Sequence, residues 1–273
     1  MRFTLYISIC AMLAVVASTA NSYAADRDTV ARASWEAGVE AYNNKEYDEA
    51  VKAFESVVAS DQKSADVYYN LANAYFKLGQ QGGASSRPFA AGELGRAVLN
   101  YERALKLDPT MDDARYNLDI AKDMTNDTEA VPDSFLSMVW QAMARAMTTN
   151  GWVTLSLSSF FATALLVLVY LLHGAVVVRK VAFFVSLFTL LLFVVSTALS
   201  FTQQRATMNV SRAVILTNDT TPVHASPDSS SKIIRQPSQG VTVELEREHG
   251  EWTEVRFADG EKGWVRTRVV EVI

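Results

Sequence analysis

Few residues of this 273-residue chain have the types and spacing that catalysis or metal binding requires. The three histidines, His173, His224 and His249, are far apart and have no Cys, Asp or Glu at the spacing of a metal site. The one cysteine, Cys10, lies in an apolar N-terminal stretch. The sequence shows no phosphate-binding loop, dinucleotide fingerprint or nucleophile elbow. It therefore predicts a protein that is not an enzyme and that has no metal or cofactor.

Acidic residues slightly outnumber basic ones, which gives the chain a formal net charge of −5 at pH 7. Neither of the polar segments, residues 26–133 and 203–273, carries a basic field that would follow a phosphate backbone. Nucleic-acid binding is therefore not expected.

Residues 31–125 repeat with the period of stacked helical pairs. Gly38 and Ala72 lie 34 residues apart and hold matching places in two segments. The first segment contains Tyr47-Asp48-Glu49-Ala50-x3-Phe54, and the second contains Tyr68-x2-Leu71-Ala72-x2-Tyr75. The small residues let two helices approach closely, and Pro109 ends one helix so that another can begin. One pair cannot bury its apolar face alone, so we expect neighbouring pairs to stack.

These motifs resemble the tetratricopeptide repeat (TPR) family over residues 26–125, although Gln62 replaces the usual proline and Trp35 is one residue out of place. In that family the first helix of each repeat lines a concave face that grips a peptide segment or helix of a partner protein. The resemblance implies such a groove at Trp35, Tyr42, Tyr69, Asn70, Asn73, Phe76, Tyr116 and Asn117. The alternative is that these side chains only pack and solvate a short stack.

Within the implied groove, Asn70 and Asn117 hold equivalent places, where an amide can bind the backbone of an extended peptide. The groove positions are mainly aromatic and amide, with Lys77 the clearest base, so recognition of a C-terminal carboxylate is not expected. The second repeat is interrupted by an insertion at residues 80–94, which is rich in Gly, Ser and Ala and predicts a loop. Docking of Phe89 into a partner or a lipid surface is the alternative function of this insertion.

The N-terminus predicts export from the cytoplasm. Arg2, an apolar run and then Ser22-Tyr23-Ala24 are typical of a secretory signal peptide over residues 1–24. An uncleaved anchor helix is the alternative. In both cases the residues that follow leave the cytoplasm.

The apolar block of residues 151–201 predicts a transmembrane hairpin with spans at 152–172 and 181–201, each long enough to cross a bilayer. A hairpin buried inside a globular core is the disfavoured alternative. Arg179 and Lys180 place the connector, 173–180, in the cytoplasm by the positive-inside rule. Both flanking segments would then face the periplasm from the inner membrane of a bacterium.

Two further features surround the predicted spans. Ser156, Ser159 and Thr163 could form a helix-packing face, or could bond back to their own helix. Within the linker of residues 126–150, Ser134–Met147 has apolar residues at helical spacing. It could lie along the membrane surface as an amphipathic helix, or extend the first span rigidly.

Residues 209–273 read as about five short strands, because apolar and polar residues alternate and Asp259-Gly260 is typical of a hairpin turn. A sheet this small would curl on itself to cover its edges, which favours a barrel. The motifs Gly250-x-Trp252-x2-Val255 and Gly263-Trp264-Val265 resemble the bacterial SH3-like family, whose members commonly act as binding modules, some of them for cell-wall peptides or glycans. Trp252 and Trp264 could contact such a ligand, or pack the barrel.

The expected fold is therefore multidomain α + β, with an α-helical TPR stack, a two-helix transmembrane hairpin and a small SH3-like β-barrel. This order of parts resembles the BatE-type family of the Bacteroides aerotolerance (Bat) group. The resemblance implies a scaffold or adaptor in an envelope complex, with partners that carry von Willebrand A domains. The competing hypothesis is a sensor or tether of the cell wall, in which the SH3-like domain binds peptidoglycan.

Overall fold

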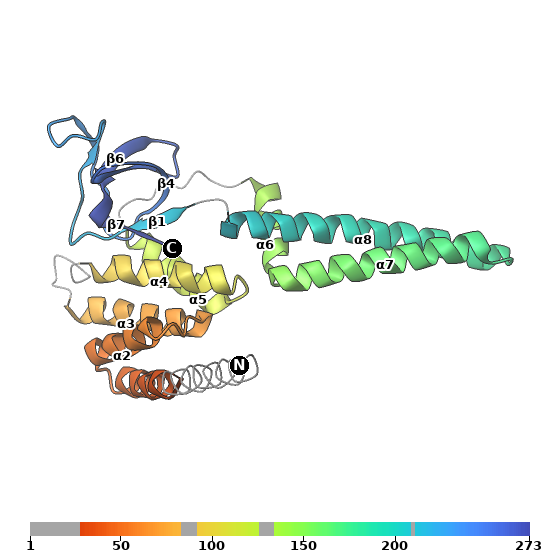
Figure 1. Ribbon diagram of the computed structural model, residues 1–273, viewed down its shortest axis with the longest axis horizontal. Helices are drawn as coiled ribbons and strands as arrows, with labels where there is room; N and C mark the ends of the chain where they lie inside the picture. Colours follow the sequence, from red (N-terminus) through yellow and green to blue (C-terminus); the bar gives the residue numbers. More distant parts are fainter. Residues whose placement is uncertain (1–27, 83–91, 126–133, 209–210) are drawn as a thin grey trace, which may run out of the picture.

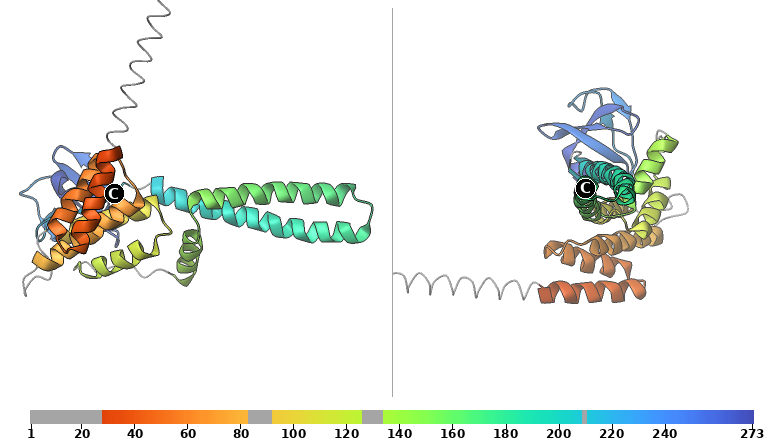
Figure 2. Two further views of the ribbon diagram at one scale, coloured as in Figure 1. Left: turned by 90° about the horizontal axis from the view of Figure 1, so that it is seen from below. Right: turned by 90° about the vertical axis from the view of Figure 1, so that its right-hand side faces the viewer.

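The computed structural model describes residues 28–82, 92–125, 134–208 and 211–273. A helical stack, a two-helix hairpin and an antiparallel sheet follow one another along the chain (Figure 1). The stack and the sheet lie together at one end of the hairpin, and the connector of the hairpin lies at the far end (Figures 1 and 2). The predicted signal peptide, residues 1–24, lies outside the described residues.

The helical stack begins with a helix over residues 28–43. Four helices complete it: α2 (Tyr47–Ala59), α3 (Ala65–Gly82), α4 (Glu93–Leu107) and α5 (Asp112–Asp123). A β-carbon at Gly38 would lie only 2.7 Å from the ring of Phe54, so this glycine lets the first helix approach α2 closely. Phe54 and Tyr101 are among the largest fully buried side chains of the stack. The stacked helical pairs that the repeat predicts are present.

The insertion in the second repeat is shorter than predicted. Helix α3 continues through Gly82 and α4 starts at Glu93, so both ends of the expected loop are helical. Leu94 explains the early start of α4, because it is only 3% exposed and joins the apolar core of the stack. The middle of the insertion, with Phe89, lies outside the described residues.

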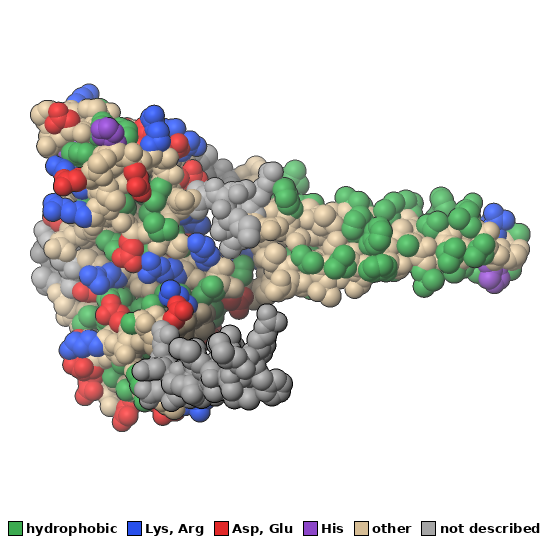
Figure 3. Space-filling model, viewed as in Figure 1, with side chains coloured by type: hydrophobic (Ala, Val, Ile, Leu, Met, Phe, Trp, Pro, Cys, Tyr) green, Lys and Arg blue, Asp and Glu red, His purple; other side chains and the backbone are tan. Residues whose placement is uncertain are grey.

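The hairpin consists of α7 (Thr149–Leu172) and α8 (Val176–Met208), and both helices are long and apolar enough to cross a membrane. Apolar side chains cover the outside of the hairpin, whereas charged side chains cover the stack and the sheet (Figure 3). The connector comprises residues 173–175 rather than 173–180. Arg179 and Lys180 belong to the first turns of α8, and the Arg179 guanidinium lies over the ring of Tyr170.

Hydroxyl groups line the seam between α7 and α8. The Ser156 and Thr197 hydroxyl oxygens are 2.7 Å apart. The Thr163 hydroxyl lies 2.8 Å from the Thr189 hydroxyl on α8 and 2.8 Å from the Ser159 carbonyl on its own helix. Ser159 instead donates to the Leu155 carbonyl of its own helix. The predicted residues therefore divide between both interpretations, because Ser156 contacts the other helix, Ser159 bonds to its own helix and Thr163 is within reach of both.

Helix α6 (Phe135–Arg145) is separate from the first span. The side chain of Ser134 caps α6, and Thr148 caps α7 by accepting from the backbone N–H of Gly151. Two new caps within fifteen residues show that α6 is not a rigid extension of α7. Apolar side chains of α6 remain exposed, among them Phe135, Leu136, Met138 and Met143.

Over the described residues, the C-terminal sheet has seven strands in the order β3-β2-β6-β5-β4-β1-β7, and neighbouring strands are antiparallel. Their bounds are β1 (Arg212–Ile215), β2 (Val223–His224), β3 (Ile233–Arg235), β4 (Thr242–His249), β5 (Trp252–Arg256), β6 (Lys262–Arg266) and β7 (Val270–Val272). A short 3-10 helix, Thr267–Val269, precedes β7. Valines such as Val223, Val255 and Val265 form a second core within the sheet.

The sheet is open, with β3 and β7 as its two edges, and it differs in this from the closed barrel that the sequence predicts. The reason lies in what covers the β7 edge. Arg103 of α4 donates to the carbonyl of Val272, and Lys106 donates to the carbonyl of Ile273. Side chains of the helical stack thus satisfy edge carbonyls that a closing strand would otherwise bond.

Candidate functional site

A cluster of two tyrosines and two asparagines connects three helices of the stack. Tyr101 of α4 donates to Asn73 Oδ1 of α3 at 2.6 Å, and Asn117 Nδ2 of α5 donates to the same oxygen at 3.0 Å. Asn117 Nδ2 also lies 3.5 Å from the hydroxyl of Tyr69, whose ring packs near Tyr101. Burial raises the pKa of Tyr101, and the neighbouring Tyr69 adds to this, so its hydroxyl stays protonated. We call these four residues the Tyr–Asn cluster.

The Tyr–Asn cluster leaves one donor and one acceptor unused. Because Asn73 Oδ1 already accepts two hydrogen bonds, its Nδ2 group points elsewhere. Neither Asn73 Nδ2 nor Asn117 Oδ1 has a hydrogen-bond partner among the described residues. An amide nitrogen and an amide oxygen held this way match the alternating C=O and N–H groups of a peptide backbone. Asn73 and Asn117 are both half-buried, so the two groups are partly accessible.

The structure brings Asn73, rather than Asn70, together with Asn117. Asn70 is four residues downstream of Asp66 on α3, and its Nδ2 donates to the Asp66 carbonyl at 2.8 Å. This local bond uses one of the two N–H donors of the Asn70 amide, and the assignment of Asn70 to a bound peptide stays a prediction. By spacing, Asn70 and Asn117 hold equivalent positions in their repeats. Only the packing of the helices shows that Asn117 contacts Asn73, whereas Asn70 bonds to its own helix.

The aromatic residues of the implied groove have different surroundings. Trp35 packs edge-on against Phe54 of α2, with ring centroids 5.5 Å apart, so it serves the interior of the stack. Tyr42 packs against Tyr47, and burial raises its pKa. Phe76 is half-buried. Tyr116 is 69% exposed, beside Asn117, and is the aromatic group most available to a partner.

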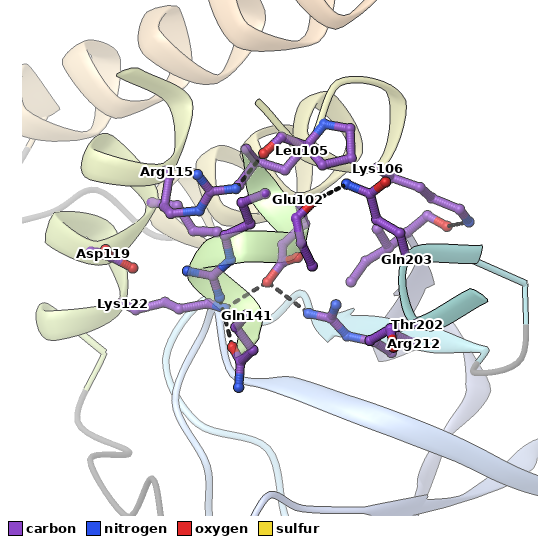
Figure 4. Close-up of a pocket in the computed structure, with 15 residues that line it drawn as sticks. Glu102, Leu105, Lys106, Arg115, Asp119, Lys122, Gln141, Thr202, Gln203 and Arg212 are labelled. Carbon is purple, nitrogen blue, oxygen red and sulfur yellow. Dashed lines mark hydrogen bonds and ion pairs between the residues drawn. The ribbon is translucent and has the colours of Figure 1, made fainter. Parts of the chain in front are cut away.

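A buried ion-pair network joins the helical stack to the sheet. The carboxylate of Glu102 on α4 accepts from Lys122 of α5 at 2.6 Å and from Arg212 of β1 at 2.8 Å. Figure 4 shows these two cations reaching Glu102 from opposite sides. The Glu102 side chain is only 7% exposed. Burial alone would raise its pKa, but the charges of Lys122 and Arg212 and their hydrogen bonds outweigh burial and lower it.

Apolar contacts extend the same junction. Val214 of β1 is fully buried and belongs to the core of the helical stack, with Leu216 packed against that core. A β-carbon at Gly95 of α4 would lie 3.2 Å from the backbone nitrogen of Gly240, which itself donates to the Ile215 carbonyl. Close backbone approach and a shared core therefore hold the stack and the sheet together as one head.

Sequence reasoning missed this junction. Glu102 reads in sequence as one more acid on the solvated face of a helix, and Arg212 lies 110 residues away. The sequence carried one signal of the junction. Gly95 lies among residues that favour a helix, and a glycine inside a helix often has a packing reason such as a close contact.

The two tryptophans of the sheet are not equivalent. Trp252 is 7% exposed, lies edge-on to His224 and is covered by the Arg266 guanidinium, 4.3 Å from its ring centroid. Trp264 is half-buried and lies opposite His224 in the register of β2 and β6. Trp264 is thus the more accessible of the two to a ligand. Over the described residues, no cluster of His, Cys, Asp and Glu side chains could hold a metal ion.

These features define a class of protein in which a helical stack and a β-sheet domain pack against each other beside a hairpin that is apolar enough to span a membrane. Comparison with known families supports the two domains separately. The family model described as TPR repeat matches residues 38–79, and the model described as Bacterial SH3 domain matches residues 219–271. Both matches indicate a role in protein–protein interaction, and the second is consistent with binding to a cell wall. Comparison with curated proteins finds no match to this chain.

Proposed function

We propose that this protein is a membrane-anchored adaptor, not an enzyme, whose helical repeats hold a partner protein while an SH3-like domain provides a second binding module. The observation that carries the proposal is the junction at Glu102, which joins the two domains into one head at one end of the hairpin. A head of this kind holds two binding surfaces in a fixed arrangement relative to each other. That geometry suits the assembly of partners on one membrane face.

The partner segment that fits best is an extended peptide or the end of a helix. Asn73 Nδ2 would donate to a peptide carbonyl and Asn117 Oδ1 would accept from a peptide N–H, while Tyr116 would add apolar area. Aromatic rings contribute contact area at low entropic cost, because they have only two side-chain torsions.

We place both domains on the periplasmic face of a bacterial inner membrane. Arg179 and Lys180, directly after the connector of the hairpin, support a cytoplasmic connector by the positive-inside rule. The order of signal peptide, TPR repeats, hairpin and SH3-like domain resembles the Bat group. We therefore propose membership of a Bat-type stress-tolerance complex, with von Willebrand A-domain proteins as partners.

The test is affinity purification of the full-length protein from native membranes, followed by identification of the proteins recovered. The variant Asn73→Ala/Asn117→Ala removes the unused donor and acceptor, and Asn43→Ala/Asn44→Ala is a matched control at exposed positions. Recovery of a von Willebrand A-domain protein by the wild type and the control, but not by the cluster variant, supports the proposal. Equal recovery by all three proteins would contradict it.

A second candidate function is binding of the SH3-like domain to peptidoglycan, and the match to the bacterial SH3 family together with the half-buried Trp264 favours it. Co-sedimentation of the full-length protein with purified sacculi, compared with a Trp264→Ala variant, separates the two functions. Binding to sacculi that Trp264→Ala abolishes supports a wall tether. Absence of sacculus binding leaves the adaptor as the account of this protein.

A further inference from the structure

A cavity of about 460 Å³ lies where the helical stack, the sheet and the hairpin meet. Its walls come from α4, α5, α6, α8 and β1, so the cavity exists only when all three parts are packed together (Figure 4). Figure 4 shows Arg115 and Lys122 of α5 on one side, and Gln203 of α8 and Arg212 of β1 on the other.

The lining carries more positive than negative charge. Five basic residues line the cavity against two acidic ones, Glu102 and Asp119; the bases are Lys106, Arg115, Lys122, Arg145 and Arg212. Glu102 is already neutralised, because it is buried against both Lys122 and Arg212. Arg115 and Arg145 therefore provide most of the uncompensated positive charge.

The charges of Arg115 and Arg145 repel each other, and Asp112 and Asp119 offset this effect on Arg115 only in part. Arg115 donates to the Pro109 carbonyl and lies 3.3 Å from Asp112, whose side chain is 96% exposed and therefore screened by water. Arg145 donates to the amide oxygen of Gln141, and it has no ion-pair partner among the described residues. Burial lowers the pKa of Arg115, and the charge of Arg145 lowers it further. An anion between them would relieve this repulsion.

The cavity lies at the end of the apolar hairpin. Arg145 is the last residue of α6, three residues before the cap of α7, and Gln203 lies near the end of α8. The Gln203 Nε2 group donates to the carbonyls of Ala144 and Met147, which fixes the end of α6 beside α8. With α7 and α8 in a bilayer, the cavity would lie at the depth of the lipid headgroups.

The exposed apolar face of α6 points to the same location. Phe135 and Leu136 are 81% and 76% exposed, and Met138 and Met143 of the same helix are also exposed. A helix with this face lies in a membrane interface, with the apolar side chains among the acyl chains. The cavity then adjoins the lipid surface directly rather than bulk water alone.

We propose that this cavity binds the phosphate group of an anionic phospholipid, held between Arg115 and Arg145. The planar guanidinium group offers paired N–H donors that match phosphate oxygens, and basic pockets beside membrane helices bind lipid headgroups in this way. Leu105, Leu118 and Ile273 provide apolar lining for the glycerol region. The inference rests on the proposed membrane position of the hairpin, but not on the identity of any protein partner.

A bound lipid would link α5 of the stack to α6 at the membrane surface. The lipid would therefore set the angle of the head as well as its distance from the bilayer. A head whose orientation depends on anionic lipid would present its partner-binding face only in membranes of suitable composition.

The test uses the full-length protein in nanodiscs of phosphatidylcholine alone, or of equal parts phosphatidylcholine and phosphatidylglycerol. Native mass spectrometry after release from the discs counts retained lipids. The wild type is expected to retain one phosphatidylglycerol, with about tenfold weaker retention in Arg145→Gln and in Arg115→Gln/Arg145→Gln. Arg247→Gln, at an exposed position of β4, is the control and is expected to behave as the wild type.

Arg145→Gln is the decisive variant, because among the described residues the Arg145 side chain bonds only to Gln141 of its own helix, so we expect the packing of the stack to be kept. Equal retention of phosphatidylglycerol by the wild type and this variant would overturn the proposal. Addition of inorganic phosphate distinguishes the two sources of the anion. Displacement of the lipid by millimolar phosphate would show a site for soluble phosphate instead, and would overturn the assignment to a lipid. Partner recovery in detergent tests the adaptor function separately.

Discussion

Glu102 and Arg212, which are 110 residues apart in the sequence, form an ion pair of 2.8 Å between the helical stack and the sheet. Glu102 lies in the middle of α4 and Arg212 is the first residue of β1, so the pair crosses the boundary between the helical stack and the sheet. Lys122 completes the network from α5. A buried carboxylate shared by two cations is costly to break from one side, because the charges left behind remain partly desolvated.

Replacement of Glu102 by alanine should therefore destabilise the whole head. We expect Glu102→Ala to lower the free energy of unfolding by about 2–3 kcal/mol, since it removes two charge-assisted hydrogen bonds from a buried site. For a head of this size the melting temperature should fall by about 5–10 °C. Thermal unfolding of the detergent-solubilised protein measures the shift. Glu49→Ala, whose pair with Lys52 is exposed, should leave the melting temperature unchanged.

Stability should depend on pH through the same carboxylate. Burial raises the pKa of Glu102, but Lys122 and Arg212 lower it by more, so its pKa in the folded state lies below the ordinary value of 4.5. A group with a depressed pKa stabilises the fold above its unfolded value, and that contribution is lost as the pH falls through the folded value. Below about pH 4.5, the melting temperature of the wild type should therefore fall more steeply than that of Glu102→Gln. Parallel pH profiles would show that Glu102 does not contribute to the dependence.

Gly95 should control the contact between the two domains. A β-carbon there would lie 3.1–3.2 Å from Leu216 Cδ2, Gly240 N and Ile215 O, so alanine requires small shifts and valine requires the sheet to move away from α4. We expect Gly95→Val to increase cleavage by a protease between residues 208 and 212 much more than Gly95→Ala does. Gly174→Val, at a position where no atom lies within 4 Å, is the control. Unchanged cleavage in Gly95→Val would contradict the packed arrangement.

Tyr101→Phe should separate the structural role of the Tyr–Asn cluster from its binding role. Loss of one hydrogen bond to Asn73 should cost about 1 kcal/mol of stability. It should also leave Asn73 Oδ1 with the Asn117 bond alone and loosen the amide pair, so partner binding should weaken more than stability does. Dissociation rates of the partner, compared with those for Tyr47→Phe, measure this difference.

The sequence predicts the parts of this protein better than their relationships. The repeats and the hairpin follow from periodic patterns, because Gly38, Phe54 and the apolar spans act locally or over one repeat. Contacts between side chains from distant segments of the chain produce no such periodic pattern. The amide that joins Asn117 is Asn73 rather than Asn70, since a rotation of one helix face decides which side chain is in reach.

The sequence did not predict that the sheet stays open, and the reason is related. The prediction of a barrel assumes that the sheet must cover its own edges, but α4 covers the β7 edge through Arg103 and Lys106. Nothing in residues 209–273 alone encodes a helix from another domain as the partner of that edge. The junction at Glu102 is the largest feature of the structure that the sequence does not predict.

The most direct test of the adaptor function is site-specific photocrosslinking at Tyr116 in the full-length protein in native membranes. Tyr116 is exposed beside the Tyr–Asn cluster, so a photoreactive phenylalanine there should form one discrete adduct with a partner protein. The same group at Ile233, an exposed position at the edge of the sheet, serves as the control. An adduct at residue 116 that Asn73→Ala/Asn117→Ala abolishes is the predicted result. A photoreactive group at Tyr116 that yields no protein adduct, in cells where the protein is folded and membrane-bound, would contradict the account.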